Sequence, residues 1–403
     1  MKRPPDPLLG LGLSRAHDAR ALGIVLLVSL FVAVPAAEAQ TLELIQGFRT
    51  CPTAAESDIR LHPLGELGGD ADPASIQHWA RVVSLRPAGY TAGPTFAEGA
   101  MSRYGEDGTF QGFLTRSGGG PGELIGRNYL ILSGRDSLVT VLDRAQTRLT
   151  QIRWDGTPVR TTLLSIPSNF NNAAYHPSGR LLVNRPVYNL PGAPIPLHLW
   201  DLDGTDLGPV GPPLERFRLD EEFLAWRTLA PSLSPPGFLS APPHVYRVDL
   251  FDLNGALTRQ WRIVSSWRSD EPWGRERAQL RPQPEAVEGL WQDEQGLIWL
   301  GSSVPTPGEL EPVLEILARW GHTPPANWWN HRVHSVLEVF HPDEARVLAC
   351  LQHPERLFYS PDGELVWTAR ETEEGDVRLR LFRVQLDTNH RTGRLELLRY
   401  THE

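Results

Sequence analysis

The sequence predicts an all-β protein, a β-propeller of six four-stranded blades, from three observations. Short apolar strands alternate with tight turns from residue 78 to the end of the chain. Two turn types recur: Ser/His-Pro-x-Gly before an apolar strand, and a strand ending in Asp followed by a Gly-containing turn. The units repeat every 40 to 60 residues or so, roughly the period of a propeller blade. A pair of β-sandwiches or a parallel β-helix fits this recurrence less well.

The clearest unit is residues 355–400, where the turn Pro361-Asp362-Gly363 joins two strands. Its four strands are expected at 357–359, 365–367, 377–386 and 394–400. One such unit is marginal in water, so it must stack on others. The five preceding units are expected around the strands 78–85 and 100–114, 137–164, 173–200, 246–264, and 287–300 with 334–351.

The segment before the repeats, residues 40–77, is expected to be partly irregular, with the propeller spanning 78–403. Residues 41–45 alternate weakly and predict an early strand. We expect this strand to join the last blade and close the ring. Residues 49–75 are polar, contain Gly and Pro, and predict irregular structure.

The N-terminus, residues 1–39, resembles a signal peptide. Basic residues precede an apolar run at 21–36 that is too short to span a bilayer comfortably, and the run ends in the small-x-small triplet Ala37-Glu38-Ala39. We therefore expect a periplasmic or secreted protein that begins near Gln40, with no transmembrane segment after cleavage. An uncleaved N-terminal anchor is the alternative.

The charge and lysine content exclude several function classes. The chain carries a formal charge of −9, and residues 1–39 carry four basic and three acidic side chains, so the remainder carries −10. An acidic surface repels phosphate backbones, so no nucleic-acid partner is expected. The protein is expected to be a monomer. Lys2 is the only lysine. A mature chain without lysine has no P-loop lysine, no Schiff base and no lysine general base.

Cys51 and Cys350 are the only cysteines. In an oxidising compartment they can form a disulfide that closes a very long loop. Two buried free thiols are the alternative, because Cys350 lies in an apolar run where small hydrophobic residues belong.

Two short motifs carry a family resemblance. The segment Asp293-Glu294-Gln295-Gly296-Leu297-Ile298-Trp299-Leu300-Gly301 resembles the D-x-x-G-x-I/L-W-x-G signature of regulator-type propeller repeats. The segment Gly118-Gly119-Gly120-Pro121-Gly122-Glu123-Leu124 resembles the G-x-G-P-G-E-F segment of exported bacterial six-bladed propellers related to NHL-repeat proteins. The resemblance implies fold and export. It does not imply an activity, because this fold serves scaffolds, sensors and enzymes alike.

An insertion in the fifth unit, residues 304–332, is the segment that the repeat explains least. Apolar residues at helical spacing predict a short helix over 309–320, followed by Gly321 and a Pro-Pro pair. Exposed aromatic side chains form binding hot spots, so we expect a lid or a partner-binding knob here; a helix that caps the blade with buried tryptophans is the alternative. The candidate binding residues of this insertion are Trp320, Trp328, Trp329, His331 and Arg332.

A second loop, residues 267–284, holds the candidate binding residues Trp273 and Arg275. Its arginines favour an acidic partner, although nearby carboxylates offset much of their charge. The glycine-rich stretch at 118–123 is expected to connect two blades, with anion binding by its backbone N–H groups as the alternative.

No compact catalytic or metal-binding motif is present: the chain has no H-E-x-x-H and no G-x-S-x-G. The sequence therefore favours a non-catalytic propeller without a cofactor that binds a protein, glycan or small molecule. The alternative is a lactonase-like hydrolase or lyase with Ca²⁺ or another divalent metal in the central channel, to which several blades would contribute ligands. Candidate side chains for the channel mouth are Asn172, Asp220, Glu221, Glu288 and Glu355.

Overall fold

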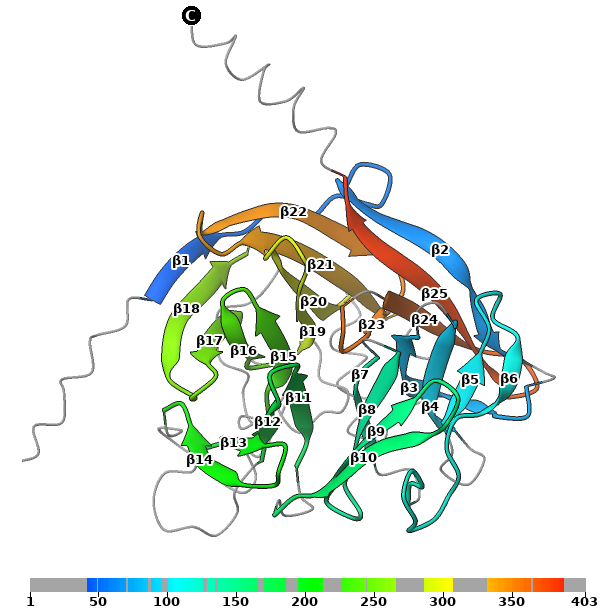
Figure 1. Ribbon diagram of the computed structural model, residues 1–403. Coiled ribbons are helices and arrows are strands. Elements are labelled where there is room, and N and C mark those ends of the chain that lie inside the picture. The colour runs from blue at the N-terminus through cyan, green and yellow to red at the C-terminus, as the bar shows by residue number, and fades with distance from the viewer. Residues whose placement is uncertain are drawn as a thin grey trace, which may run out of the picture. The chain divides into compact units, whose positions relative to one another are not determined.

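The computed structural model describes fourteen stretches of the chain. They are residues 42–48, 50–69, 72–85, 88–95, 101–125, 129–134, 137–165, 170–185, 195–212, 226–243, 245–265, 286–306, 332–363 and 365–387. Within them the chain forms 25 β-strands and no helix, so none of these stretches contains a helix that could cross a membrane (Figure 1). The helix predicted at 309–320 lies outside the described residues.

Three sheets are simple antiparallel meanders in which each strand pairs with the next one in sequence (Figure 1). The first contains β3 (Ile76–Ser84), β4 (Tyr90–Thr95), β5 (Ser102–Tyr104) and β6 (Phe110–Phe113). The second contains β7 (Tyr129–Ser133), β8 (Leu138–Asp143), β9 (Arg148–Arg153) and β10 (Pro158–Leu163). The third contains β11 (Asn172–His176), β12 (Arg180–Asn184), β13 (Leu197–Asp201) and β14 (Asp206–Val210).

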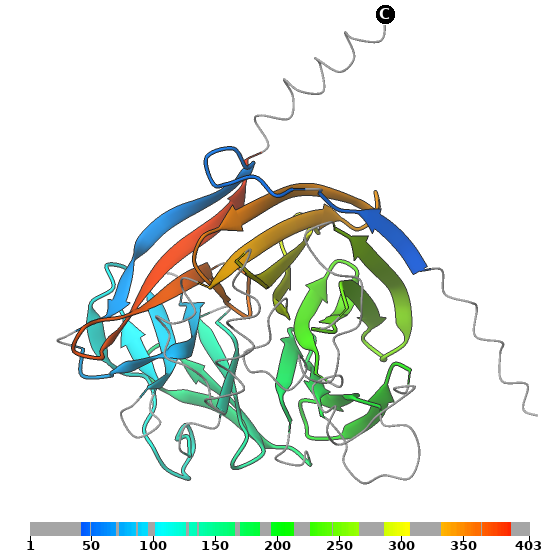
Figure 2. The same ribbon diagram turned by 180° about the vertical axis from the view of Figure 1, so that it is seen from behind.

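A nine-stranded sheet joins two further meanders through β1 (Leu42–Gln46). One meander contains β15 (Thr228–Leu233), β16 (Pro236–Ala241), β17 (Arg247–Asp252) and β18 (Leu257–Val264). The other contains β19 (Ala286–Gln292), β20 (Ile298–Pro305), β21 (Val333–His341) and β22 (Arg346–His353). Strand β1 runs parallel to β18 over its whole length and meets β22 at one residue pair, Gln46 and Arg346 (Figures 1 and 2).

The last sheet takes one strand from the beginning of the chain. Its order is β2 (Ile59–Gly68), β25 (Val377–Leu386), β24 (Leu365–Glu371) and β23 (Phe358–Tyr359), and Figure 1 shows the blue β2 beside the red β25. The expectation that 41–45 joins this sheet is wrong, because that segment forms β1 beside β18. Residues 59–68 are a strand and not irregular: Pro63 and Gly65 lie at a register shift that hides the strand in the sequence. The strand predicted at 394–400 lies outside the described residues.

Hydrophobic clusters hold neighbouring sheets together. Trp367 and Leu379 of the last sheet pack with Val82 and Tyr104 of the first. Leu142 of the second sheet packs with Trp200 of the third. The first strands also meet in succession: β3 contacts β7, β7 contacts β11, β11 contacts β15, β15 contacts β19, and β19 contacts β23. Four-stranded sheets stacked face to face around their first strands make the fold β-propeller-like.

Candidate functional site

A cavity of about 320 Å³ lies where the first strands of the sheets converge, and we call it the inner-strand cavity. Its polar lining comes from Arg81 on β3, Asn172 on β11, Thr228 on β15, Glu288 on β19 and Arg356 just before β23. Tyr359 and Ser360 add hydroxyl groups, and the remaining lining residues are Ala80, Ala173, Leu229, Gly289, Leu290, Phe358, Pro361 and Trp367. Concave sites with apolar walls and a few convergent polar groups are typical of ligand-binding sites.

Arg81 begins a chain of hydrogen bonds that crosses from strand to strand. Its Nη1 donates to the backbone oxygen of Ile131 on β7 at 3.3 Å, and its Nη2 donates to Oδ1 of Asn172 on β11 at 3.1 Å. The Nδ2 of Asn172 donates in turn to the backbone oxygen of Arg227, next to β15, at 3.2 Å. These bonds give Arg81 a defined orientation, because groups on both β7 and β11 hold its guanidinium.

The same pattern continues on the other sheets. Thr228 Oγ1 donates to the backbone oxygen of Val287 on β19 at 2.7 Å. Arg356 donates two hydrogen bonds to Glu288, from Nε to Oε2 at 3.2 Å and from Nη2 to Oε1 at 2.5 Å. The two side chains are only 14% and 18% exposed, so this bidentate pair is largely withdrawn from water. Side chains on successive inner strands are thus linked around the cavity.

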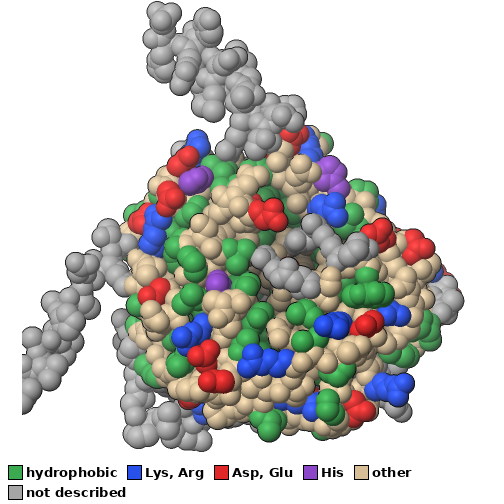
Figure 3. Space-filling model, viewed as in Figure 1, with side chains coloured by type: hydrophobic (Ala, Val, Ile, Leu, Met, Phe, Trp, Pro, Cys, Tyr) green, Lys and Arg blue, Asp and Glu red, His purple; other side chains and the backbone are tan. Residues whose placement is uncertain are grey.

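Charge is unevenly distributed in this lining. Glu288 neutralises Arg356, whereas Arg81 hydrogen-bonds only neutral oxygens among the described residues. Burial, followed by the positive charge of Arg144, lowers the pKa of Arg81 to about 10. Arg81 therefore stays protonated at neutral pH. On the surface that Figure 3 shows, by contrast, acidic and basic side chains are interspersed.

Tyr359 forms part of the wall, and its ring packs directly against the backbone of two glycines. A Cβ at Gly289 would lie 2.4 Å from Cγ of Tyr359, and one at Gly301 would lie 2.1 Å from its Cζ. Only glycine leaves room for the ring at these positions. Burial, and then the negative charge of Glu288, raises the pKa of the Tyr359 hydroxyl above its ordinary value. The Tyr359 hydroxyl is therefore neutral at physiological pH.

The donor set in this lining does not fit a divalent metal. Among the described lining residues Glu288 is the only carboxylate, and Arg356 already holds both of its oxygens. Ca²⁺ takes six to eight oxygen ligands, and catalytic Zn²⁺ takes three protein ligands. The described part of the cavity thus supplies no ligand set for the channel-metal enzyme.

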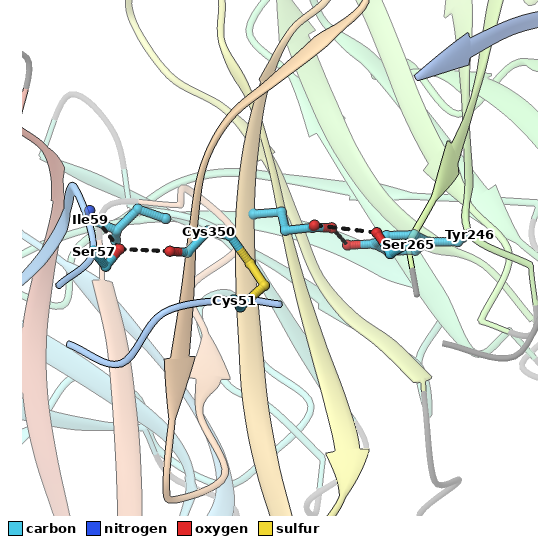
Figure 4. Close-up of a disulfide and its surroundings, with 7 residues drawn as sticks. Cys51, Ser57, Ile59, Tyr246, Ser265 and Cys350 are labelled. Carbon is cyan, nitrogen blue, oxygen red and sulfur yellow. Dashed lines mark hydrogen bonds between the residues drawn. A yellow bond between two sulfur atoms is a disulfide. The ribbon is translucent and has the colours of Figure 1, made fainter. Parts of the chain in front are cut away.

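A separate group of potential metal ligands consists of Cys51 on the segment between β1 and β2, Cys350 on β22 and Glu338 on β21. Cys51 and Cys350 are joined by a disulfide with their Cα atoms 5.2 Å apart (Figure 4). Glu338, on β21, accepts hydrogen bonds from the hydroxyls of Tyr246 and Ser265. The disulfide occupies both sulfur atoms, so this group is a buried structural link.

The glycine-rich stretch that was considered as an anion site binds its own side chain. Oε2 of Glu123 accepts a hydrogen bond from the backbone N–H of Gly120 at 2.7 Å. The backbone N–H of Gly118 donates to the carbonyl of Leu124 at 3.0 Å, and Arg148 donates to the carbonyl of Gly119. The carboxylate of Glu123 takes the place that an external anion would need. The stretch connects β6 to β7, as expected for a link between sheets.

Most of the predicted binding residues are not placed by this structure. Arg332 lies directly before β21, where its carbonyl accepts a bond from the Thr306 N–H at 2.8 Å. The other candidates lie outside the described residues: Trp273, Arg275, Trp320, Trp328, Trp329 and His331, together with Asp220 and Glu221.

Two of the predicted channel-mouth residues, Asn172 and Glu288, line the inner-strand cavity. Glu355 does not line it and instead pairs with Arg370. The sequence analysis missed Arg81 and Arg356. Position is a signal for Arg356, which lies just before the first strand of its unit, as Asn172 and Thr228 lie at the start of theirs. Arg81 lies in the second half of β3, so strand position does not single it out.

Comparison with known proteins supports the fold and leaves the activity open. The chain matches no protein-family model and no curated protein. Solved structures do resemble it. A member of the DUF4221 family from Bacteroides vulgatus shares 10% identity at a TM-score of 0.55, over 81% of this chain and 99% of its own. A candidate exported protein from Bacteroides fragilis shares 9% identity at 0.54, over 86% of this chain and 99% of its own.

Virginiamycin B lyase from Staphylococcus aureus shares 10% identity at a TM-score of 0.40, over 80% of this chain and 99% of its own. That score carries no inference about activity. At these identities the likeness shows the fold alone, which is β-propeller-like, and nothing in it singles out NHL repeats.

Proposed function

We propose that this protein is an exported, six-bladed β-propeller that acts as a non-catalytic binding module for a small molecule. The observation that carries this proposal is the inner-strand cavity, to which strands of separate sheets bring oriented polar groups and apolar walls. Its volume of about 320 Å³ suits a small ligand better than a protein segment, since it is near the lower end of known ligand sites.

Six blades are supported by the contacts among the first strands. These contacts run from β3 through β7, β11, β15 and β19 to β23, and β23 contacts β3 again. Each of the six resulting pairs of neighbouring sheets shares its own buried cluster. The nine-stranded sheet then counts as two blades that β1 links along their outer strands.

Export is supported by the signal-peptide pattern of residues 1–39 and by the buried Cys51–Cys350 disulfide. Disulfides persist in oxidising compartments and are rare in the cytosol. The similar structure from Bacteroides fragilis is itself described as a candidate exported protein.

A blocked cavity tests the function directly. A thermal-shift screen of a small-molecule fragment library on residues 40–403 should give ligands whose effect disappears in Thr228→Phe, because the phenyl ring fills space at the cavity wall. Thr161→Phe, on the exposed β10, is the matched control and should keep every ligand. Fragments that stabilise Thr228→Phe as much as the wild type would place binding elsewhere and contradict the proposal.

The hydrolase or lyase alternative is tested by elemental analysis. A channel enzyme with Ca²⁺ or another divalent metal requires about one equivalent of metal in the protein purified without chelators. The proposal of a binding module expects sub-stoichiometric metal and no change in the unfolding temperature when EDTA is added. A stoichiometric metal that EDTA removes, with a loss of stability, would favour the enzyme.

A further inference from the structure

Arg81 is a partly buried cation in the cavity lining, and none of its contacts with described residues is to a carboxylate. Its two hydrogen bonds go to a backbone carbonyl and to the amide oxygen of Asn172. A guanidinium carries five N–H donors in a planar fork, so three remain for another group. Neutral oxygens orient the fork but do not cancel its charge, and Arg144, the other charged group that acts on it, is also positive.

The rest of the lining sets the charge that a ligand should carry. The described lining contains two arginines and one glutamate, and Glu288 pairs with Arg356. One positive charge therefore remains, on Arg81. A phosphate monoester carries close to two negative charges at neutral pH, and its second charge would have no cationic partner in the described lining. A carboxylate carries one charge and matches the planar fork of arginine with two parallel hydrogen bonds.

Apolar surface in the cavity determines the remainder of the ligand. The Arg356 guanidinium lies over the ring of Phe358, 5.1 Å from its centroid, and the ring of Trp367 stacks with Phe358 at a centroid distance of 6.2 Å. Leu229 and Leu290 supply aliphatic wall on the neighbouring strands. An aromatic ring or short alkyl chain would lose its contact with water against these residues.

We propose that the inner-strand cavity binds a small organic acid with a single carboxylate, which Arg81 anchors while the apolar part lies against Phe358 and Leu229. This inference rests on the proposed function and names the ligand class for the same site. Asn172 is a positioning residue, since it contacts the guanidinium through Oδ1 and holds the fork toward the cavity.

Matched pairs of acids and amides test the proposal. The probes are phenylacetate, benzoate and hexanoate, each beside its primary amide, with phenyl phosphate as a second anion, titrated calorimetrically into residues 40–403. At least one carboxylate should bind roughly thirtyfold more tightly than its amide, the loss expected when a desolvated charge pair is broken. Arg81→Gln should reduce carboxylate affinity by a similar factor and leave amide affinity unchanged, whereas Arg81→Lys should retain part of it.

The control variant is Arg103→Gln, because Arg103 also donates two bonds to backbone carbonyls, those of Trp154 and Gln111, away from the cavity. It should bind the carboxylate like the wild type. Thermal unfolding without probe shows whether Arg81→Gln is folded. If this variant is unfolded, the ratio of acid to amide affinity in the wild type tests the proposal.

The proposal is overturned by amides that bind as tightly as acids, by a folded Arg81→Gln that keeps carboxylate affinity, or by the absence of carboxylate binding at millimolar concentration. Tighter binding of phenyl phosphate than of any carboxylate rejects the single-charge ligand. Failure of the proposed function looks different. Amide binding that Thr228→Phe abolishes would keep the cavity as the site and reject only the anion, whereas carboxylate binding insensitive to Thr228→Phe would reject the cavity.

Discussion

The ring of Tyr359 occupies a slot that Gly289 and Gly301 keep open on adjacent strands of the neighbouring sheet. Cβ atoms at these glycines would fall within 2.4 Å and 2.1 Å of ring atoms, far inside van der Waals contact. The interior is close-packed, so the ring has no space into which to retreat. Tyr359 therefore both lines the cavity and packs between two sheets, so a change in this packing would also move the cavity wall.

Gly301→Ala should therefore destabilise the protein by about 1–3 kcal/mol, the usual cost of overpacking, through displacement of Tyr359. Urea unfolding monitored by tryptophan fluorescence measures this free energy of unfolding. Gly119→Ala is the matched control, because the nearest heavy atom to its Cβ would be 4.0 Å away. Equal stability of the two variants would show that the Tyr359 slot is loosely packed.

Histidine burial gives the protein a pH dependence. Burial is the main cause that lowers the pKa of His198, His334 and His353 below the ordinary 6.5. Below pH 6.5 the unfolded chain takes up protons that the folded protein does not. The free energy of unfolding therefore decreases as the pH is lowered below 6.5, and the stabilising contribution of these neutral histidines is complete above that pH. Carboxylates with lowered pKa values, such as Asp203, lose their contribution only at more acidic pH, below about 4.

We expect the unfolding temperature to decrease between pH 7.5 and pH 5, and His334→Gln to reduce that decrease. His334 is 9% exposed, so its neutral form is favoured in the folded state. Thr161→Phe, the surface variant on the exposed β10, should leave the pH profile unchanged. Calorimetry at a series of pH values provides the comparison, and an identical profile for His334→Gln and wild type would refute this assignment.

At the scale of elements, the segment before the first meander links sheets that are remote in sequence. Strand β1 lies beside β18, the disulfide at Cys51 joins the chain to β22, and β2 pairs with β25. The hydroxyl of Ser57 adds a 2.7 Å bond to the carbonyl of Cys350 (Figure 4). Because the two cysteines are 299 residues apart, their bond closes almost the whole described chain into a loop.

Reduction of this disulfide should lower the free energy of unfolding by roughly 2–5 kcal/mol, since the unfolded chain regains the entropy of a very long loop. Urea midpoints with and without a phosphine reductant measure the effect. The double variant Cys51→Ala/Cys350→Ala should be less stable than the oxidised wild type and indifferent to reductant. Mass spectrometry verifies reduction, so an unchanged midpoint in a reduced sample would speak against a stabilising role.

At the scale of the whole molecule, the pairing of β2 with β25 decides how the last sheet is completed. β25 is ten residues long and would present an open edge if β2 were absent. Long unpaired edges invite pairing with other chains. The outer strand of the last sheet therefore comes from the N-terminal side of the repeats, so the first and last parts of the described chain must meet before this sheet is complete.

Two deletions test this closure with opposite expectations. Removal of residues 40–69 should cause aggregation or loss of cooperative unfolding, since β25 loses its partner and Cys350 its disulfide. Removal of residues 388–403 should leave the unfolding temperature within a few degrees, because β25 is already paired with β2. Size-exclusion chromatography and thermal unfolding distinguish the cases. A soluble, cooperative first variant with an aggregated second one would favour a closing strand at 394–400.

Local sequence patterns determined the all-β class and most strand positions. Alternating residues such as those of 377–386 and turns such as Pro361-Asp362-Gly363 specify strands and hairpins through the chain's own period and turn chemistry. The glycine-rich connection at 118–123 was predictable for the same reason, because its bonds are made within a few residues. Asn172 and Glu288 could also be proposed as cavity residues, from their place beside strand ends.

Only the tertiary structure decided which distant segments pair and where charge collects. Strand β2 is interrupted by Pro63 and Gly65 and is recognisable only by its partner β25, more than 300 residues away. Arg81 lies in a local pattern like that of any strand arginine, and its role depends on Ile131, Asn172 and the Glu288–Arg356 pair contributed by other sheets. Charge compensation and edge pairing are long-range interactions, so no periodicity within one strand encodes them.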